Sequence, residues 1–280
     1  MDKVGVVGCG LMGAGIAEVC ARAGKDVVVA ESSPAAVEAG LRRLQTSLER
    51  AQTRGRIDSA AEVLARITVE GSLDGMADRD FVVEAIVEDE AVKVELFGKL
   101  DAIVTSPDAI LASNTSSIPI MKLAVATGRP SHVIGVHFFN PVPVLSLVEL
   151  VPSLLTATDT TERARAFVEQ DLGKHAIDCQ DRAGFVVNAL LIPFILSAIR
   201  MLESGFATAE DIDQGLVRGA AHPQGPLALA DLIGLDTTKA VAESLYQEFR
   251  EQLYAPPPLL ARMVEAGLLG RKTGRGFYTY

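Results

Sequence analysis

The first 31 residues contain a strand, a glycine-rich turn, a helix and a second strand, and this order restricts the fold more than any other feature of the chain. The segment KVGVVG, residues 3–8, has the Val-rich composition of a strand, and residues 11–23 carry helix formers up to Gly24. A second strand, DVVVA, follows at residues 26–30. Strands joined through a helix run parallel with a right-handed crossover, so we predict a βαβ unit within a parallel sheet.

The turn after the first strand has the sequence GCGLMG, which matches the pattern GxGxxG. In this pattern the first glycine permits a tight turn, the second lets a pyrophosphate approach the backbone, and the third allows the helix to pack closely on the strand. The amino end of the helix then faces the anion. The candidate contacts for a dinucleotide are Gly8, Gly10, Leu11, Met12 and Gly13.

Glu31 lies 23 residues after Gly8, at the end of the second strand, where a carboxylate can accept hydrogen bonds from an adenosine ribose. The same carboxylate repels a 2′-phosphate, and the following Ser32 and Ser33 supply no arginine to hold one. We therefore expect NAD rather than NADP as the cofactor. The alternative is a glycine-rich turn without a ligand, with Glu31 as a solvated strand end.

Strands and helices alternate as far as Asp181, after which strand signals stop. This pattern predicts an α/β domain of residues 1–183, with a Rossmann-type mostly parallel sheet, and an all-helical C-terminal domain of residues 184–280. Residues 35–66 interrupt the alternation with a long charged helical stretch, which we interpret as an inserted helical arm. Further strands are expected at 67–69, 81–84, 109–112, 133–137, 145–151 and 175–179, and further helices at 185–204, 209–218, 226–254 with a break near Gly234, and 258–267.

Composition excludes several classes of function. A net charge of −10 argues against nonspecific binding to nucleic acid or to an anionic membrane. The three cysteines, Cys9, Cys20 and Cys179, lack CxxC spacing and indicate neither a disulfide framework nor a metal site, which favours a reducing cytoplasm. The longest apolar run, residues 185–199, is shorter than the roughly 20 residues that span a bilayer, and we expect no secretion signal ahead of the first strand.

A histidine ends the apolar strand predicted at residues 133–137, and open α/β sheets bind ligands just beyond the carboxyl ends of their strands. Oxidation of an alcohol removes a proton from oxygen, and the imidazole of His137 can accept it near neutral pH. Twelve residues further on, Glu149 interrupts an apolar strand, where a histidine on the adjacent strand would give the carboxylate a partner. The alternatives are a hydrogen-bonded core histidine and a glutamate on an exposed strand face.

Other polar groups occur where a ligand could reach them. The segment SNTSS, residues 113–117, follows another strand and places small polar side chains at the same sheet edge; the alternative is a capping turn before a helix. Asn188 lies within the apolar segment 185–194 and is either structural or faces a crevice between the domains.

The predicted arm has two different helical faces. The stripe expected to pack consists of Leu41, Leu44, Leu48 and Ala51, at 3-4-3 spacing. Another face carries Arg43, Ser47, Arg50 and Arg54. A row of arginines could hold a phosphorylated ligand such as a coenzyme A ester, and ordinary solvated helix charge is the alternative.

These segments together resemble the L-3-hydroxyacyl-CoA dehydrogenases, in particular the short, stand-alone 3-hydroxybutyryl-CoA dehydrogenases, over essentially the whole chain. The likeness is carried by VGVVGCGLMGAGIA, FVVEAIVEDEAVKVELF, ASNTSS, HFFNPVPVLSLVEL, AGFVVNALLIPF, HPQGPLALADLIGLDTT and GRKTGRGFY. The motif HFFNPVP, with a glutamate twelve residues past its histidine, is the most specific of these.

The resemblance implies a role for each matching residue. His137 would be the general base and Glu149 its orienting partner, and the substrate oxygen would receive hydrogen bonds from Ser116 and Asn188. The nicotinamide side of NAD would be contacted by Glu88, Lys93, Asn114 and Asn140. Within the arm, coenzyme A would be contacted by Ser47 and Arg54.

The implied reaction is the reversible, NAD-dependent oxidation of an (S)-3-hydroxyacyl-CoA to the 3-oxoacyl-CoA, with 3-hydroxybutyryl-CoA as the expected substrate and a place in fatty acid metabolism such as β-oxidation. A homodimer formed through the C-terminal domain is also implied. Two alternatives are a dehydrogenase of a free hydroxy acid, such as L-gulonate or carnitine, and a non-catalytic NAD-binding structural protein.

Overall fold

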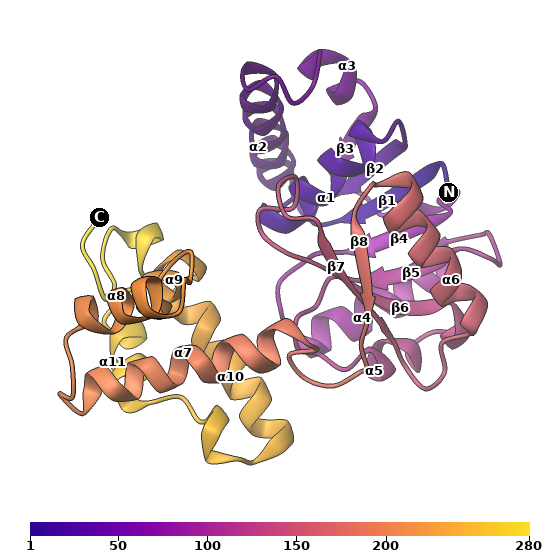
Figure 1. Cartoon of the computed structure of the whole chain (residues 1–280). Coiled ribbons are helices and arrows are strands. Elements are labelled where there is room, and N and C mark those ends of the chain that lie inside the picture. The colour runs from indigo at the N-terminus through magenta and orange to yellow at the C-terminus, as the bar shows by residue number, and fades with distance from the viewer. The chain divides into compact units, whose positions relative to one another are not determined.

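The βαβ unit expected from the first residues forms part of a larger sheet in the computed structural model, which describes all 280 residues, and its strands lie second and third from one edge. β1 (Lys3–Val7) and β2 (Asp26–Ala30) pair in parallel and are connected by α1 (Leu11–Arg22). The chain divides into two compact units, Met1–Asp181 and Arg182–Tyr280, each with its own hydrophobic core (Figure 1). None of its helices combines the length and the apolar character that crossing a bilayer requires.

The sheet has eight strands in the order β3-β2-β1-β4-β5-β6-β7-β8. All neighbouring strands run parallel except β6 and β7, which pair antiparallel. The order reverses between β1 and β4, and α/β sheets bind ligands in the crevice at such a switch point. The remaining strands are β3 (Ile67–Glu70), β4 (Phe81–Glu84), β5 (Ile110–Ser113), β6 (Val133–Phe138), β7 (Leu147–Pro152) and β8 (His175–Asp178).

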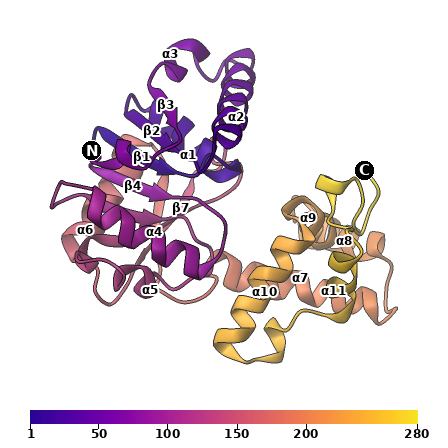
Figure 2. The ribbon, with the colours of Figure 1, turned by 180° about the vertical axis from the view of Figure 1, so that it is seen from behind.

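Helices cover both faces of this sheet, which is why its strands are nearly continuous apolar runs. One face packs against α1, α2 (Pro34–Thr53) and α6 (Thr158–Ala166). Figure 2 shows α4 (Glu90–Ile103) and α5 (Ile120–Ala124) on the other face. The pleat alternates side chains between the faces, so Val136 and Phe138 enter the first core while His137 points to the α4 and α5 side.

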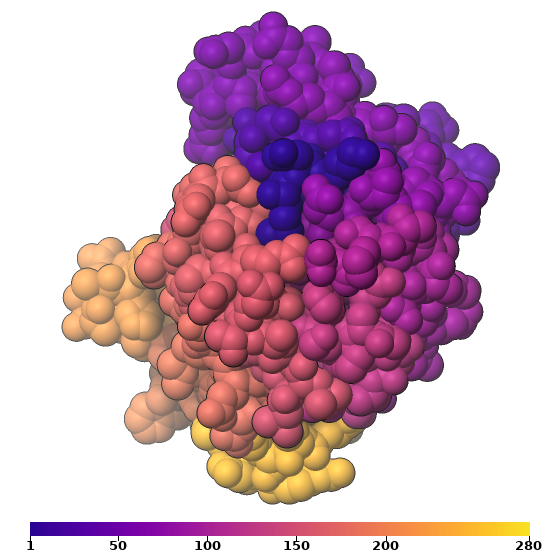
Figure 3. All heavy atoms as spheres, turned by 90° about the vertical axis from the view of Figure 1, so that its right-hand side faces the viewer, coloured from indigo at the N-terminus to yellow at the C-terminus, as the bar shows by residue number.

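The expected arm is helical but is not one continuous helix. α2 begins at the N-cap Ser33, whose hydroxyl accepts a hydrogen bond from the Ala36 N–H at 3.3 Å. The chain leaves the helix near Gly55, which has a φ of +65°, and α3 (Ala60–Leu64) follows. In Figure 3 the purple atoms of this segment project at the top of the first unit.

The prediction that Leu41 belongs to the packed stripe is wrong. Leu44, Leu48 and Ala51 are buried as expected, whereas Leu41 is 39% exposed and Gly40 is buried in its place. A side chain at position 40 would meet Cys9, since an added Cβ would lie 2.7 Å from the Cys9 Sγ. The helix therefore approaches the glycine turn through a bare backbone, which rotates Leu41 outward.

The second unit is built from helices and contains no named strand, only isolated bridges between Gly270 and Arg275 and between Arg275 and Thr279. Its helices are α7 (Val187–Glu203), α8 (Ala209–Gly219), α9 (Pro226–Ile233), α10 (Leu235–Phe249) and α11 (Pro258–Glu265). Gly234, with a φ of +103°, separates α9 from α10 where the sequence indicated a break. A mostly parallel sheet with an inserted helical arm, followed by a helical unit, confirms the predicted fold class.

Candidate active site

The three glycines of the turn after β1 meet three different steric demands. Gly8 has a φ of +94°, a conformation that favours glycine. An added Cβ on Gly13 would lie 1.8 Å from the Gly8 carbonyl oxygen, so this position allows α1 to pack against the turn. An added Cβ on Gly10 would meet nothing within 4 Å. Gly10 therefore leaves room on the outer side of the turn, where a ligand can approach the backbone.

The start of α1 suits an anion. Its N-cap is Gly10, which has no side chain to accept hydrogen bonds from the first backbone N–H groups, and no acidic residue lies in the first turn. These N–H groups and the helix dipole are the features that bind phosphate at helix N-termini.

Glu31 lies directly after β2, beside the glycine turn. Its carboxylate accepts hydrogen bonds from the Cys9 N–H and, at 3.0 Å, from the Ser32 N–H. Arg43 of α2 donates to the Cys9 carbonyl oxygen from the other direction. Arg43, one of the arginines noted on the arm, is thus attached to the glycine turn.

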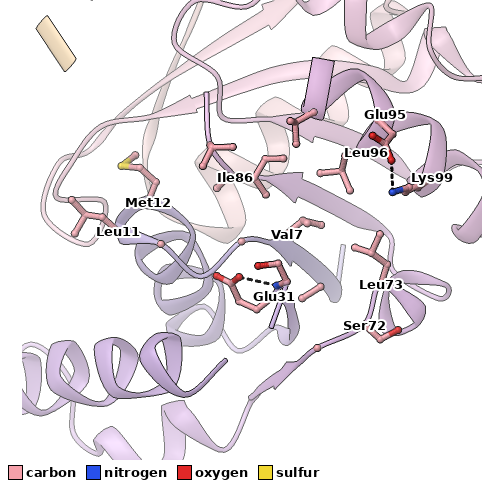
Figure 4. Close-up of a pocket in the computed structure, with 18 residues that line it drawn as sticks. Val7, Leu11, Met12, Glu31, Ser72, Leu73, Ile86, Glu95, Leu96 and Lys99 are labelled. Carbon is pink, nitrogen blue, oxygen red and sulfur yellow. Dashed lines mark hydrogen bonds and ion pairs between the residues drawn. The ribbon is translucent and has the colours of Figure 1, made fainter. Parts of the chain in front are cut away.

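A cavity of about 860 Å³ opens at this position (Figure 4). Leu11 and Met12 lie at one end and Glu31 near its middle, while Leu73 and Leu96 lie at the other end. Lining residues that the sequence did not single out are Ser72, Leu73, Ile86, Val87, Val92, Glu95, Leu96 and Lys99. Val92, Leu96 and Lys99 follow helical spacing on one side of α4, which was the available signal.

The residues present fit a dinucleotide. The open space at Gly10 and the uncapped helix start suit a pyrophosphate, Glu31 suits a ribose hydroxyl, and the apolar end around Leu73 and Leu96 suits a flat ring.

His137 and Glu149 form a buried pair at the carboxyl edge of the sheet. The antiparallel register of β6 and β7 places them directly opposite each other. The Nδ1–H of His137 donates to the Glu149 Oε2 at 2.7 Å. His137 is 6% exposed and Glu149 is 0% exposed, and the Phe139 ring contacts the imidazole edge-on at 4.6 Å between centroids. This hydrogen bond selects the tautomer in which Nε2 is the basic nitrogen.

Glu88 and the serine loop, residues 113–118, form a second polar cluster. The Glu88 Oε1 accepts hydrogen bonds from the Thr115 hydroxyl at 2.5 Å, the Ser116 N–H at 3.0 Å and the Ser117 hydroxyl at 3.2 Å. The Ser116 hydroxyl lies 3.4 Å from the same oxygen. The Lys93 ammonium contacts the Glu88 Oε2 at 2.7 Å.

The pKa of Glu88 is set by opposing effects. Burial acts to raise it, but the Lys93 charge and the hydrogen bonds from Lys93, Thr115 and Ser116 outweigh burial. The pKa therefore lies below its ordinary value of 4.5, and the carboxylate is ionised at neutral pH.

The other expected residues are distributed as follows. Asn114 accepts a hydrogen bond from the Phe138 N–H at 2.9 Å, which ties the serine loop to the strand end that carries His137, and Asn140 is exposed just beyond that strand end. Lys93 is only 1% exposed, so its ammonium is enclosed. Ser47 and Arg54 lie on α2 and at its C-terminal end, and Asn188 is half-buried in the first turn of α7, in the second unit.

Sequence reasoning missed Glu84 and the hydrogen bonds within the segment 113–117. Glu84, Ser113 and Thr115 are buried and bonded to one another or to the predicted residues. Their signal was a glutamate and a serine that end neighbouring apolar strands.

Comparison with protein families gives two matches that together span nearly the whole chain. Residues 3–182 match the family model described as "3-hydroxyacyl-CoA dehydrogenase, NAD binding domain". Residues 184–280 match the model described as "3-hydroxyacyl-CoA dehydrogenase, C-terminal domain".

Individual relatives are similar over their full length. A protein of Mycobacterium tuberculosis named 3-hydroxybutyryl-CoA dehydrogenase is 57% identical over 282 residues, covering 100% of this chain and 99% of that protein. A crystal structure of M. tuberculosis FadB2 has a TM-score of 0.99 at 57% identity, covering 100% of this chain and 99% of that one. The crystal structure of (S)-3-hydroxybutyryl-CoA dehydrogenase PaaH1 from Ralstonia eutropha has a TM-score of 0.93 at 46% identity, with coverage of 100% and 99%.

Proposed function

The chain belongs to the 3-hydroxyacyl-CoA dehydrogenase family, an NAD-dependent family of oxidoreductases, and we propose that its own substrate is (S)-3-hydroxybutyryl-CoA, oxidised reversibly to the 3-oxoacyl-CoA. The observation that carries this proposal is the buried hydrogen bond between His137 and Glu149, at the same sheet edge as the glycine turn. The relatives named above support the short-chain substrate.

In the proposed mechanism His137 is the general base. Its Nε2 takes the proton from the C3 hydroxyl of the substrate, and a bound NAD would supply the acceptor for the hydride that leaves C3. Glu149 holds the imidazole in the required tautomer and stabilises the imidazolium that forms. Ser116 and Asn188 are proposed to hydrogen-bond the substrate oxygen and hold it in line with the base.

NAD is the cofactor of this family, and we propose contacts for it along the glycine turn and the serine loop. Its adenosine and pyrophosphate would contact Gly8, Gly10, Leu11, Met12, Gly13 and Glu31. Its nicotinamide side would contact Glu88, Asn114 and Asn140, with Lys93 supporting this contact from behind Glu88.

The rest of the molecule has proposed roles that follow from the family resemblance. Residues 1–183 would form the NAD-binding domain, with Ser47 and Arg54 of its arm contacting coenzyme A. Residues 184–280 would form the substrate and dimerisation domain of a homodimer. We further propose a cytoplasmic location and a role in fatty acid metabolism such as β-oxidation.

The base assignment is tested by His137→Ala. We expect kcat with 3-hydroxybutyryl-CoA to fall by about 10² to 10⁴, with the dissociation constant for NADH unchanged within about twofold. The matched control is His132→Ala. His132 immediately precedes β6, at the end of the strand away from His137, and its side chain is hydrogen-bonded to the neighbouring Ser131 hydroxyl. Wild-type turnover by His137→Ala would exclude His137 as the base.

The substrate class is tested by Arg54→Glu. If the arm holds the phosphates of coenzyme A, this charge reversal should raise the KM for a CoA ester by about tenfold or more and leave the KM for NAD unchanged. Arg42→Glu is the control, since Arg42 lies on the same helix and pairs with Glu38. A panel of CoA esters and free 3-hydroxy acids completes the measurement, and preference for a free acid would contradict the CoA assignment.

A further inference from the structure

Glu84, the last residue of β4, is a fully buried carboxylate for which the mechanism above has no use. It is 0% exposed and lies on the sheet face that also carries Ser113 and His137. The parallel register pairs Glu84 with Ser113 on β5. A carboxylate is retained at such a depth only where hydrogen bonds and opposite charge compensate its lost hydration.

Both oxygens of Glu84 have defined partners. The Oε1 accepts a hydrogen bond from the Ile86 N–H at 2.8 Å and contacts the Lys93 ammonium at 2.9 Å. The Oε2 accepts a hydrogen bond from the Ser113 hydroxyl at 2.6 Å. The orientation of the carboxylate is therefore fixed from three directions: its own strand end, α4 and β5.

The first connection from Glu84 reaches the serine loop through Lys93. The Lys93 ammonium is enclosed between Glu84 and Glu88, at 2.9 Å and 2.7 Å. Glu88 then accepts the hydrogen bonds from the Ser116 N–H and the Thr115 hydroxyl. Because Glu88 itself is 38% exposed, its position depends on the buried Lys93 behind it.

The second connection reaches the same loop through Ser113. The Ser113 hydroxyl, which donates to Glu84, also accepts a hydrogen bond from the Thr115 N–H at 3.1 Å. The Thr115 hydroxyl in turn accepts hydrogen bonds from the N–H groups of Ser117, at 3.2 Å, and Ile118, at 2.9 Å. Both connections thus end at Thr115, the residue immediately before Ser116.

We propose that Glu84 is a positioning residue for the dehydrogenase reaction, which acts through Lys93 and Ser113 to fix the serine loop and hence the hydroxyl of Ser116. The inference rests on the proposed function, in which Ser116 holds the substrate oxygen. Lys93 is then the cation that links two carboxylates, one buried and one at the surface. A displacement of about 1 Å in a group that positions substrate can lower turnover by about 100-fold, so a buried anchor of this kind has a measurable effect.

Glu84→Gln tests the proposal because the amide keeps the size of the side chain and removes its charge. We expect kcat to fall by about tenfold or more, and kcat rather than the KM for NAD is the deciding measurement, because Glu88 is itself proposed to contact NAD. Amide hydrogen exchange at residues 116–118 should become about tenfold faster, whether or not substrate is present. Glu18→Gln is the matched control, since Glu18 is also buried, at 1% exposure, and pairs with one cation, Arg22, on α1.

A double-mutant cycle with Ser116→Ala separates positioning from general stability. If Glu84 acts through the Ser116 hydroxyl, Glu84→Gln should lower kcat much less in a Ser116→Ala background than in the wild type. The same loss of kcat in both backgrounds, or unchanged exchange at residues 116–118, would overturn the proposal. If Glu84→Gln does not fold, Ser113→Ala takes its place, because it removes only the second connection. Unchanged amide exchange at residues 116–118 in Ser113→Ala would then overturn the proposal.

These outcomes distinguish this inference from the proposed function. If the wild type does not oxidise CoA esters, the proposed function fails, and the exchange rates at residues 116–118 still decide whether Glu84 fixes the loop. If the wild type is active and Glu84→Gln behaves like Glu18→Gln in both kcat and exchange, the function stands and the positioning role fails.

Discussion

The pKa of Glu88, a partly exposed carboxylate, depends on the buried Lys93 beside it. Burial of part of the group acts to raise its pKa, yet the Lys93 ammonium and the hydrogen bonds from Thr115 and Ser116 hold the pKa below 4.5. The folded protein therefore favours the ionised form more strongly than the unfolded chain does.

This depressed pKa predicts how stability depends on pH. The contribution of Glu88 is fully present above its ordinary pKa of 4.5 and is lost as the pH falls through the lower value of the folded state. Urea unfolding of the wild type should therefore show a steeper loss of free energy of unfolding below about pH 4.5 than that of Glu88→Gln. Glu162→Gln, at an exposed position on α6, is the control. Parallel profiles of wild type and Glu88→Gln would contradict the expectation.

At the scale of elements, the strands were predictable because parallel strands buried on both faces are short apolar runs with little else in them. Both ends of β2 and β4 agree with the prediction, and each of the other strands differs from it by one or two residues at one end or both. The arm was less predictable. The 3-4-3 spacing predicts that Leu41 lies on the packed face of the helix. It does not reveal that α2 approaches Cys9 at position 40, where only a glycine fits.

The candidate site likewise contains contacts that the sequence predicts and contacts that it does not. The proximity of His137 and Glu149 could be predicted, because each interrupts or ends an apolar strand and the two strands are consecutive. The connection from Glu84 to Ser113 could not, since it depends on the register between β4 and β5, which no local pattern reveals. A glutamate and a serine at strand ends are otherwise ordinary turn residues.

The approach of α2 to the glycine turn gives a test at this scale. Replacing Gly40 by Ala should add about 1 kcal/mol of helix propensity, but the clash with Cys9 should cost about 1–3 kcal/mol. We expect a net loss of thermal stability together with weaker NADH binding, because Cys9 lies between two of the glycines of the turn.

The reason for the loss can be isolated with a second substitution. In a Cys9→Gly background the clashing atoms are absent, so Gly40→Ala should become neutral or stabilising there. Gly98→Ala on α4 is the control, since the nearest atom to its added Cβ is 3.6 Å away. A higher Tm of Gly40→Ala with Cys9 present, together with unchanged NADH binding, would contradict the clash. It would show that the space between α2 and the glycine turn accommodates an added Cβ.

At the scale of the whole molecule, a carboxylate in each unit joins segments that are far apart in the sequence. In the first, Asp181 accepts hydrogen bonds from the Ile120 and Met121 N–H groups at 2.7 Å and 2.8 Å, which caps the start of α5. In the second, the buried Asp231 accepts the N–H groups of Phe277 and Tyr278, both at 2.9 Å. These hydrogen bonds attach residues 277 and 278, near the end of the chain, to α9 within the helical unit.

The helical unit nevertheless leaves apolar surface on one side of α7. Leu190 and Met201 are 72% and 41% exposed, at positions that fall on one helical stripe with the half-buried Phe194 between them. Phe206, just beyond the helix, is 80% exposed. Exposed apolar side chains concentrated in this way mark surfaces that bind other proteins, which supports the proposed dimer through this unit.

The proposed dimer predicts a molecular mass of roughly twice 29.6 kDa for the wild type by light scattering after size exclusion. Leu190→Glu should shift the protein toward the monomer, because a two-fold interface places the unpaired carboxylate of each copy in apolar surroundings. Leu154→Glu is the matched control, since Leu154 is 96% exposed in the first unit and should leave the mass unchanged. If Leu190→Glu retains the dimer and Leu154→Glu breaks it, the first unit carries the interface, and the role proposed for residues 184–280 must be revised.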